Sequence, residues 1–280
     1  MVEFIGKKGI FDGYLIELTK IDKFHPGDFS VYEIVRVEKG TPLFLEDHLN
    51  RLFRSFILEK LSVDESAENI ERMVNKLIRI NGIDKGKIKF VFYFPEFPKS
   101  ENYHFFIYYT EALFPGLEEY NGGVDVGLCT AIRNDPNAKV LNTDARKKAN
   151  QKIEDENVFE VLLVDNEGYV WEGSRSNVFF ISEGTLITPP DEAVLQGIAR
   201  KNVLEISDRH NFAVHIRKVH RTELEQMQSV FLTGTSLKVL PVRRVENLQF
   251  DVSSEILKFL DDQYDKKIAD YIKMAGKLIK

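Results

Sequence analysis

The amino-acid sequence predicts an α+β protein built in two parts. Segments rich in β-branched and aromatic residues predict strands, and segments with apolar residues at helical spacing predict helices. The two kinds of segment do not alternate regularly, as they would in a doubly wound fold. Residues 112–123 contain a Pro-Gly pair, a Gly-Gly pair and little periodicity, which predicts a boundary between the two parts.

The first part is expected to form a small sheet with two helices. Apolar residues recur at helical spacing and predict one apolar face on each of two helices: Leu49, Leu52, Phe53, Phe56 and Ile57 on the first, and Ile70, Met73, Val74, Leu77 and Ile78 on the second. The segments 87–94 and 103–110 are strongly apolar, and a connector with two prolines joins them. The predicted elements are strands over 9–18, 31–40, 87–94 and 103–110, and helices over about 46–61 and 67–80.

The second part is expected to hold closely spaced strands and three helices. The strands are expected over 124–132, 158–165, 169–173, 176–181, 185–189, 213–219 and within 229–245. The helices are expected over about 139–156, 198–210 and 253–277. We therefore expect a domain over 1–115, a linker over 116–123 and a larger domain over 124–280.

Composition excludes several classes of protein. With 44 acidic and 38 basic residues the formal net charge is −6, which argues against a nucleic-acid partner. No apolar run is long enough to predict a transmembrane helix, and the N-terminal residues do not resemble a signal peptide. Cys129 is the single cysteine, so we expect neither an internal disulfide nor a multi-cysteine zinc site. These features predict a cytoplasmic protein without a membrane partner.

Motifs of several common enzyme classes are missing from the sequence. There is no nucleophile elbow, P-loop, His-Glu-x-x-His pair or glycine-rich dinucleotide fingerprint. His215 and His220 flank the end of a short predicted strand, where we expect two partly exposed side chains and no metal site. Metalloproteases, P-loop NTPases, ordinary serine hydrolases and Rossmann dehydrogenases are therefore disfavoured.

The remaining polar motifs fit the parts of a pyridoxal phosphate site. Such a site needs a lysine for the Schiff base, an acid beside the pyridinium nitrogen, and a phosphate cup. Lys139 is the candidate lysine, at the start of a predicted polar helix, although Lys147 and Lys148 satisfy the composition equally well. Glu172 is the candidate acid, at the end of a short strand and before Gly173.

The phosphate cup has three candidate segments. Residues 195–200 enter a predicted helix through Gly197, which allows close approach to the backbone. The hydroxyl-rich turn 233–236 supplies a second wall, and Arg51 on a predicted helix supplies a cation. Each residue also has an ordinary structural explanation, as a surface lysine, a turn residue or a helix start. The residues alone leave an unidentified small-molecule site as an open alternative.

The order and spelling of these segments resemble the class IV, or fold type IV, pyridoxal-phosphate aminotransferases. This group contains branched-chain aminotransferases, D-amino acid aminotransferases and aminodeoxychorismate lyases. The resemblance covers nearly the whole chain in one consistent order. The matching segments are 31–36, 48–51, 139–142, 172–179, 188–189, 197–200, 233–236 and 241–242.

The resemblance implies a fold, a cofactor and a set of roles. It implies a small α+β domain and a larger pseudo-barrel domain, with pyridoxal 5′-phosphate between them and active sites completed in a homodimer. Lys139 resembles the Schiff-base lysine, which also shuttles a proton, and Glu172 resembles the partner of the ring nitrogen. The residues implied for the phosphate are Arg51, the backbone at Ile198 and Ala199, and Thr235. Those implied for the substrate are Tyr32, Glu33, Thr235 and Ser236.

Three departures from the family pattern concern the phosphate and the substrate. Ala199 stands where the family usually has threonine, which removes one hydroxyl donor but leaves the backbone N–H. Branched-chain and D-amino acid enzymes commonly carry an arginine that binds the substrate carboxylate in this region. This chain has Phe94 and Pro95 there instead. The tyrosine that follows the catalytic lysine in branched-chain enzymes is also missing, with Thr143 nearby.

The resemblance leaves three functions open. The first is transfer of an amino group from a branched-chain L- or D-amino acid to a 2-oxo acid. The second is a lyase of the aminodeoxychorismate type, which releases pyruvate and 4-aminobenzoate. The third is a non-catalytic binding protein on the same scaffold, which the presence of both Lys139 and Glu172 disfavours. We expect Cys129, in a strand that leads toward Lys139, to serve packing.

Overall fold

A computed structural model of the chain describes residues 4–21, 29–95, 102–111, 114–133, 135–141 and 143–278. The chain forms two compact units, neither of which is continuous in the sequence. The first comprises Met1–Leu113, Ala138–Asn142 and Ile268–Lys280, and the second comprises Phe114–Asn137 and Thr143–Lys267. The domain limits expected from the sequence stay a prediction. By contacts, the short segment that carries Lys139 groups with the first unit.

The first unit contains a six-stranded antiparallel sheet with strand order β2-β1-β6-β5-β3-β4. Its strands are β1 (Phe4–Phe11), β2 (Tyr14–Glu17), β3 (Ser30–Glu38), β4 (Thr41–Pro42), β5 (Lys85–Tyr93) and β6 (His104–Thr110). The single strand expected over 9–18 is wrong, because this segment folds as the hairpin of β1 and β2. Asp12 and Gly13 both have positive φ there, and an Asp-Gly pair favours such a two-residue turn.

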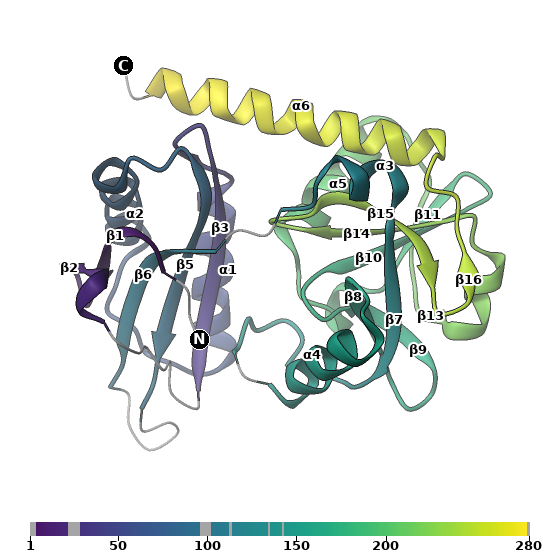
Figure 1. Ribbon diagram of the computed structural model, residues 1–280, viewed down its shortest axis with the longest axis horizontal. Coiled ribbons are helices and arrows are strands. Elements are labelled where there is room, and N and C mark those ends of the chain that lie inside the picture. The colour runs from purple at the N-terminus through teal and green to yellow at the C-terminus, as the bar shows by residue number, and fades with distance from the viewer. Residues whose placement is uncertain are drawn as a thin grey trace. The chain divides into compact units, whose positions relative to one another are not determined.

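Two helices cover one face of this sheet, as Figure 1 shows. They are α1 (Leu45–Leu58) and α2 (Ala67–Asn81), and the short 3-10 helix η1 (Leu18–Lys20) follows β2. The side chain of Ser66 accepts a hydrogen bond from the amide of Asn69 at the start of α2, and Gly82 ends the helix in the left-handed conformation. The apolar faces expected for both helices are confirmed with one exception, and they form one core with alternate residues of β3, β5 and β6. The exception is Ile57, which was expected on the apolar face of α1 but is 76% exposed.

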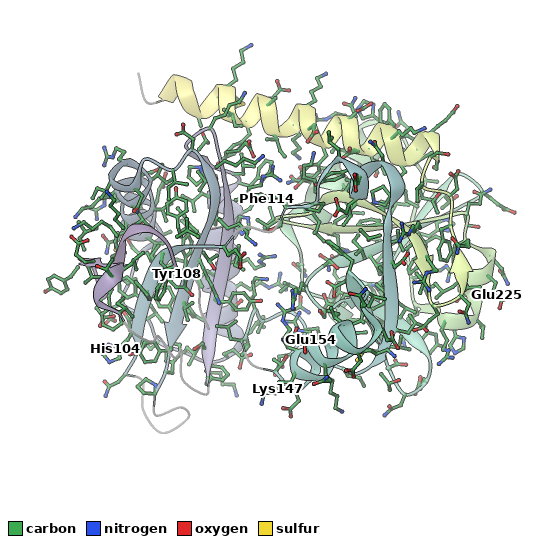
Figure 2. The ribbon with its side chains drawn as sticks, in the orientation of Figure 1. His104, Tyr108, Phe114, Lys147, Glu154 and Glu225 are labelled. Atoms are coloured by element: carbon green, nitrogen blue, oxygen red, sulfur yellow. The ribbon has the colours of Figure 1, made fainter. Side chains whose placement is uncertain are left out.

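The opposite face of the sheet carries a second, smaller cluster. Successive residues of a strand point to opposite faces, so Tyr32, Val91, Phe106 and Tyr108 lie together on the side away from the helices. Figure 2 labels Tyr108 on this sheet. Leu141, from the segment that carries Lys139, packs against the same cluster.

The second unit is built on a larger mixed sheet. Its strands are β7 (Val124–Thr130), β8 (Glu160–Val164), β9 (Tyr169–Gly173), β10 (Asn177–Ser182), β11 (Thr185–Thr188), β12 (Val214–Ile216), β13 (Val219–His220), β14 (Ser229–Gly234), β15 (Lys238–Val245) and β16 (Leu248–Gln249). The strand order is β12-β11-β10-β14-β15-β7-β8-β9-β13, with β16 paired to β15. Side chains such as Leu162, Phe180 and Leu232 form the main apolar core of this unit.

The helices of this part of the chain are α3 (Leu117–Gly122), α4 (Asp144–Glu156), α5 (Ile198–Arg209) and α6 (Glu255–Leu278), and the 3-10 helices are η2 (Asp191–Ala193) and η3 (Arg221–Gln226). The contact division between the two units falls within α6, at Ile268. Cys129 on β7 is buried against α4, which confirms its expected packing role. None of the helices described is both long and apolar enough to cross a membrane.

The start of α4 corrects one expectation about the site. The polar helix was expected to begin near Lys139, but it begins at Asp144. Thr143 is extended and its side chain accepts a hydrogen bond from the amide of Arg146, so it is the N-cap. Lys139 therefore lies outside the helix, in an extended segment.

Candidate active site

Lys139 lies in a short extended segment that pairs with the N-terminal part of β3 in the six-stranded sheet. Val140 forms an isolated antiparallel bridge with Val31 on β3. The carbonyl of Lys139 accepts a hydrogen bond from the amide of Tyr32 at 3.0 Å, and the amide of Leu141 donates to the carbonyl of Ser30 at 2.9 Å. Three neighbouring residues are thereby fixed to β3. The backbone of Lys139 is held by tertiary pairing and not by helix formation.

The side chain of Lys139 reaches the face of Tyr32. Its Nζ lies 4.7 Å from the centroid of the Tyr32 ring, a favourable distance for a cation and an aromatic face. Its amide nitrogen donates to the Oγ of Ser55, a fully buried residue of α1. The strand β3 and the helix α1 thus hold Lys139 from two sides, and its side chain is only half-buried. This arrangement gives a primary amine whose backbone is fixed by tertiary contacts.

Tyr32 and Glu33, both expected at the substrate, point to opposite faces of β3. Glu33 is fully buried against α1, where its carboxylate accepts two hydrogen bonds from the guanidinium of Arg51, at 2.7 and 2.9 Å. His48 Nδ1 lies 2.8 Å from the same carboxylate. An ionised carboxylate only accepts, so Nδ1 carries the proton. This geometry favours a role for Glu33 in holding Arg51 over direct contact with a substrate.

Charge keeps this buried cluster together. Burial alone would raise the pKa of the Glu33 carboxyl, but Arg51 and His48 hold that pKa well below its usual range. Burial also lowers the pKa of His48, against the opposing effect of Glu33, so the imidazole is neutral at pH 7. The guanidinium of Arg51 is therefore oriented by an ionised partner. Of the phosphate candidates, Arg51 is the one that lies in the first unit.

Glu172 lies at the end of β9 in the second unit, as the sequence predicted, and is almost fully buried. One carboxylate oxygen accepts a hydrogen bond from Arg133 at 2.9 Å. The other accepts from the amide of Leu195 at 3.0 Å and from the side chain of Asn177 at 3.4 Å. These donors favour the ionised carboxylate, which is the form that pairs with a protonated pyridine nitrogen.

A second buried acid orders the turn that follows Glu172. Glu160 on β8 accepts hydrogen bonds from the hydroxyls of Ser174 and Ser176 and from the amide of Arg175. The two serines of the Glu-Gly-Ser-x-Ser-Asn segment thus bind a carboxylate of their own unit. Gly173 is required beside them, because a Cβ there would lie 2.0 Å from the Oγ of Ser176.

The N-terminus of α5 has the features of an anion site. Its N-cap is Gly197, and its first turn contains no acidic residue. The helices α2 and α4, by contrast, have Ser66 and Thr143 as side-chain caps. The first amides of a helix have no partner within the helix, so those of Ile198 and Ala199 suit a phosphate. Arg200 turns away from this end, since its guanidinium bonds to Asp191 and to the carbonyl of Pro189.

The remaining candidates lie in the turn between β14 and β15. The amide of Leu237 bonds to the carbonyl of Gly234 at 3.0 Å and closes the turn, which leaves Thr235 and Ser236 at its half-buried tip. Thr233 precedes them, and its Oγ1 is buried without a hydrogen-bond partner among the residues described. The hydroxyl-rich turn expected between two strands is confirmed.

Two residues of these clusters carry no sequence signal. Ser55 and Arg133 bond to candidate residues only because the fold brings distant segments together. Phe94 lies in the region where other members of the family carry the arginine that binds the substrate carboxylate. Phe94 is buried in the core of the first unit and packs against Phe29 and Tyr103, so it does not reach a substrate.

The sequence matches the profile of a known family, described as amino-transferase class IV, over residues 30–245. That range includes most of both units and every candidate residue. The chain belongs to this family.

Named relatives of this class IV aminotransferase come from different branches. It is 31% identical over 227 residues to a probable branched-chain-amino-acid aminotransferase of Thermotoga maritima, covering 79% of each chain. It is 26% identical over 256 residues to the D-alanine aminotransferase of Bacillus licheniformis, covering 85% of this chain and 88% of the relative. The structure matches the branched-chain aminotransferase of Thermobaculum terrenum in its pyridoxal phosphate form with a TM-score of 0.85, over 96% of both chains at 22% identity. The last likeness establishes the fold, which is fold type IV.

The residues present fit the cofactor of this family, pyridoxal 5′-phosphate. The second unit offers a buried carboxylate in Glu172, which accepts hydrogen bonds from Arg133 and from the amide of Leu195, and an anion site at the start of α5. A Cβ at Gly197 would lie 2.0 Å from the Oδ1 of Asn177, so the helix start is built for a glycine. The first unit offers the amine of Lys139. The chain is a pyridoxal-phosphate-dependent aminotransferase.

Proposed function

We propose that Lys139 is the residue that binds the cofactor covalently and moves the proton during transamination. The observation that carries this assignment is the position of Lys139. Its backbone is bonded to Tyr32 and Ser55, while its amine lies over the Tyr32 ring. The alternatives Lys147 and Lys148 lie on α4, where both are exposed, and Lys147 lies 3.6 Å from Asp144.

The other candidates would hold the cofactor at its two ends. Glu172 would keep the ring nitrogen protonated, which lets the ring accept electrons from the substrate. The amides of Ile198 and Ala199, the hydroxyl of Thr235 and the guanidinium of Arg51 would bind the phosphate. Ala199 has no hydroxyl to add, and one neutral hydrogen bond contributes about 0.5–1.5 kcal/mol, so phosphate binding would be weaker but kept.

The cofactor, when bound, supplies an aldehyde for the substrate amino group and an electron-withdrawing ring. The amine of Lys139, displaced by the substrate, would take the proton from the substrate α-carbon at Nζ. Tyr32 would flank this amine and limit its orientation. Tyr32, Thr235 and Ser236 would border the substrate.

We further propose an amino acid and a 2-oxo acid as substrates. The names of the relatives, a branched-chain and a D-alanine aminotransferase, support a branched-chain L-amino acid or a D-amino acid as the donor. We also propose a homodimer in the cytoplasm. The molar mass of the protein particle in solution, measured by light scattering, distinguishes a dimer from a monomer.

The assignment of Lys139 is tested by comparing Lys139→Ala with Lys147→Ala. Purified wild-type protein and Lys147→Ala should be yellow after incubation with the cofactor, and Lys139→Ala should lose this visible absorbance on removal of free cofactor. A Lys139→Ala protein that keeps the colour and the activity contradicts the assignment. The Lys147 variant controls for the loss of one nearby positive charge.

The substrate class is tested with a panel of L- and D-amino acids. Each is mixed with the holoenzyme in the absence of a 2-oxo acid, and the change from the pyridoxal to the pyridoxamine spectrum is followed. Rapid conversion by leucine, isoleucine or valine identifies a branched-chain enzyme, and conversion by D-alanine identifies the other branch. Pyruvate release from aminodeoxychorismate, without conversion by any amino acid, would instead identify the lyase.

A further inference from the structure

The turn between β14 and β15 is held by contacts outside the turn itself. The amide of Leu237 bonds to the carbonyl of Gly234 at 3.0 Å, and Gly234 pairs across the hairpin with Lys238. Thr235 and Ser236 lie between them at the half-buried tip. One backbone hydrogen bond is a weak constraint, since many turns of this length lack it. The neighbouring side chains therefore help to decide where the two hydroxyls lie.

Lys238 has a backbone conformation that is uncommon for a lysine. Its φ is 53°, in the left-handed region where glycine is the usual residue. Residues of this kind persist where the surrounding structure holds them, and they are frequent beside ligand sites. The contacts of Lys238 therefore help to keep the shape of the turn that precedes it.

Two aspartates of α6 and one aromatic ring of α3 surround the ammonium group of Lys238. Its Nζ donates a hydrogen bond to the Oδ1 of Asp265 at 2.6 Å and lies 3.9 Å from the Oδ1 of Asp261. It also lies 4.8 Å from the centroid of the Tyr120 ring, within the range of a cation–π contact. The side chain of Lys238 is only 13% exposed, so water weakens these interactions less than on an open surface.

Tyr120 holds the turn at a second point. Its hydroxyl donates a hydrogen bond to the carbonyl of Leu237 at 2.9 Å, although 117 positions separate the two residues. The ring that faces the ammonium group of Lys238 is thus also bonded to the residue before it. A shift of the turn would disturb both contacts, so α3 and α6 restrain it together.

We propose that Lys238 is a positioning residue, which holds the hydroxyl of Thr235 where it meets the cofactor phosphate. This inference rests on the proposed function, which assigns Thr235 to the phosphate. Lys238 acts through the backbone of the turn, because its ammonium group is already paired with Asp265. A hydrogen bond weakens steeply as its donor moves or tilts, so a small shift of the turn lowers the affinity for a phosphate.

The test measures how tightly the full chain, freed of cofactor, binds pyridoxal 5′-phosphate and pyridoxal, which lacks the phosphate. Calorimetry gives both affinities without turnover. Their ratio reports on the phosphate site, because a general loss of structure would weaken both ligands. Lys238→Met, Asp265→Asn and Tyr120→Phe each remove one contact of the turn, and Lys238→Arg keeps the charge.

We expect Lys238→Met to weaken binding of pyridoxal 5′-phosphate about tenfold, as for weakened hydrogen bonds to a charged group, and to change pyridoxal binding less than about twofold. Asp265→Asn and Tyr120→Phe should lower the ratio of the two affinities in the same sense. Lys238→Arg should recover most of the ratio, because it can still pair with Asp265.

Two matched controls remove similar contacts elsewhere. Lys267 on α6 pairs with Glu205 on α5, so Lys267→Met removes an ion pair of the same helix. The hydroxyl of Tyr109 donates to the carbonyl of Ile83 at 3.1 Å, so Tyr109→Phe removes a tyrosine hydrogen bond to the backbone. Both variants should keep the wild-type ratio of the two affinities.

A wild-type ratio in Lys238→Met would overturn the proposal. So would a lower ratio in Lys238→Met with an unchanged or higher ratio in Asp265→Asn, because the lysine charge would then act on the phosphate directly. A failure of the proposed function looks different, since wild-type protein would bind pyridoxal as tightly as its phosphate.

Thermal unfolding identifies a Lys238→Met protein that does not fold. Asp265→Asn then decides the question, because the side chain of Asp265 is 55% exposed and its replacement leaves the core intact. An unchanged ratio of affinities in Asp265→Asn overturns the proposal in that case, and a lower ratio supports it.

Discussion

The amide nitrogen of Lys139 donates a hydrogen bond to the Oγ of Ser55 at 3.2 Å, although the two residues are 84 positions apart in the chain. The same hydroxyl donates to the carbonyl of Arg51 at 3.0 Å. One buried serine therefore connects the segment of the proposed catalytic lysine to the helix turn that carries a proposed phosphate ligand. The Ser55 hydroxyl bonds to the backbone of both Lys139 and Arg51, so its removal should affect the reaction as well as the fold.

Replacement Ser55→Ala removes the acceptor of the Lys139 amide. We expect the free energy of unfolding to fall by about 1 kcal/mol, as for the loss of a buried hydrogen bond. The half-reaction with an amino acid should slow about tenfold, because a small misplacement of a reacting group is costly. Urea unfolding and stopped-flow absorbance measure the two effects.

The control for Ser55 is Ser207→Ala. Ser207 is also fully buried, and its Oγ donates to the carbonyl of Val203 one turn earlier at 2.8 Å. It should lose similar stability and keep the half-reaction rate. Equal rates in the two variants would show that Ser55 does not position Lys139.

Replacement Glu33→Gln removes the charge that orients Arg51. A buried guanidinium with a neutral partner is costly, and we expect about 3–5 kcal/mol of destabilisation. The affinity for pyridoxal phosphate should fall as well, because Arg51 loses its fixed orientation. Denaturant unfolding and fluorescence titration with the cofactor measure these quantities.

Glu38→Gln is the matched control on the same strand. Glu38 pairs with Arg36 at 2.8 Å, but both side chains are partly exposed. Pairs of that kind contribute about 0–1 kcal/mol, so this variant should remain close to wild type. Similar losses in the two variants would contradict a special role for the buried pair.

Replacement Gly197→Ala should disturb the proposed phosphate site without straining the backbone. The φ of Gly197 is −67°, which any residue adopts, but the added Cβ would lie 2.0 Å from the Oδ1 of Asn177. Asn177 would shift, although it donates to the carbonyl of Leu195 at 2.8 Å. We expect about 1–3 kcal/mol of destabilisation, together with weaker cofactor binding, because overpacking a tight contact displaces its neighbours.

The comparison for Gly197 is Gly122→Ala on α3, where an added Cβ meets nothing within 4 Å. Its unfolding free energy and its cofactor affinity should both match those of wild type. If Gly197→Ala binds the cofactor as tightly as Gly122→Ala, the phosphate does not lie at the start of α5.

Asp261 on α6 gives the stability a dependence on pH. Burial raises the pKa of Asp261 to about 6, against the opposing effect of Lys238. The unfolded carboxyl ionises near its ordinary value of 3.8, so between these two values the folded state binds more protons. The contribution of Asp261 to stability is therefore greatest below pH 3.8, the pKa of the unfolded carboxyl, and it is lost as the pH rises from there to about 6.

Replacement Asp261→Asn should remove this loss. At pH 7.5 we expect a gain of about 1 kcal/mol, a discounted figure because the side chain is partly exposed, or about 2–4 °C in Tm. The gain should disappear at pH 4. Asp262→Asn, at an exposed position of the same helix, should show no such dependence. A gain in Asp261→Asn that is the same at both pH values would contradict the titration.

The secondary structure of this chain was largely predictable because local periodicity decides it. Apart from the exposed Ile57, the helices α1 and α2 bury the faces that their apolar spacing predicted, and Glu172 lies near the end of a short strand as expected. The start of α4 was not predictable in the same way. The segment from Lys139 to Glu156 is mostly polar, and only the cap at Thr143 and the pairing of Val140 with Val31 separate strand from helix.

The sequence by itself determined the α+β class, because local periodicity predicts helices and strands. It also determined the family and the cofactor, because the family's short motifs occur in this chain in the same order. The tertiary structure alone decided which side chains act together. Glu33 and Tyr32 are neighbours in sequence, yet the alternation of β3 turns one toward Arg51 and the other toward Lys139. Ser55 meets Lys139 only through the packing of α1, which is a contact between distant residues that no local pattern records.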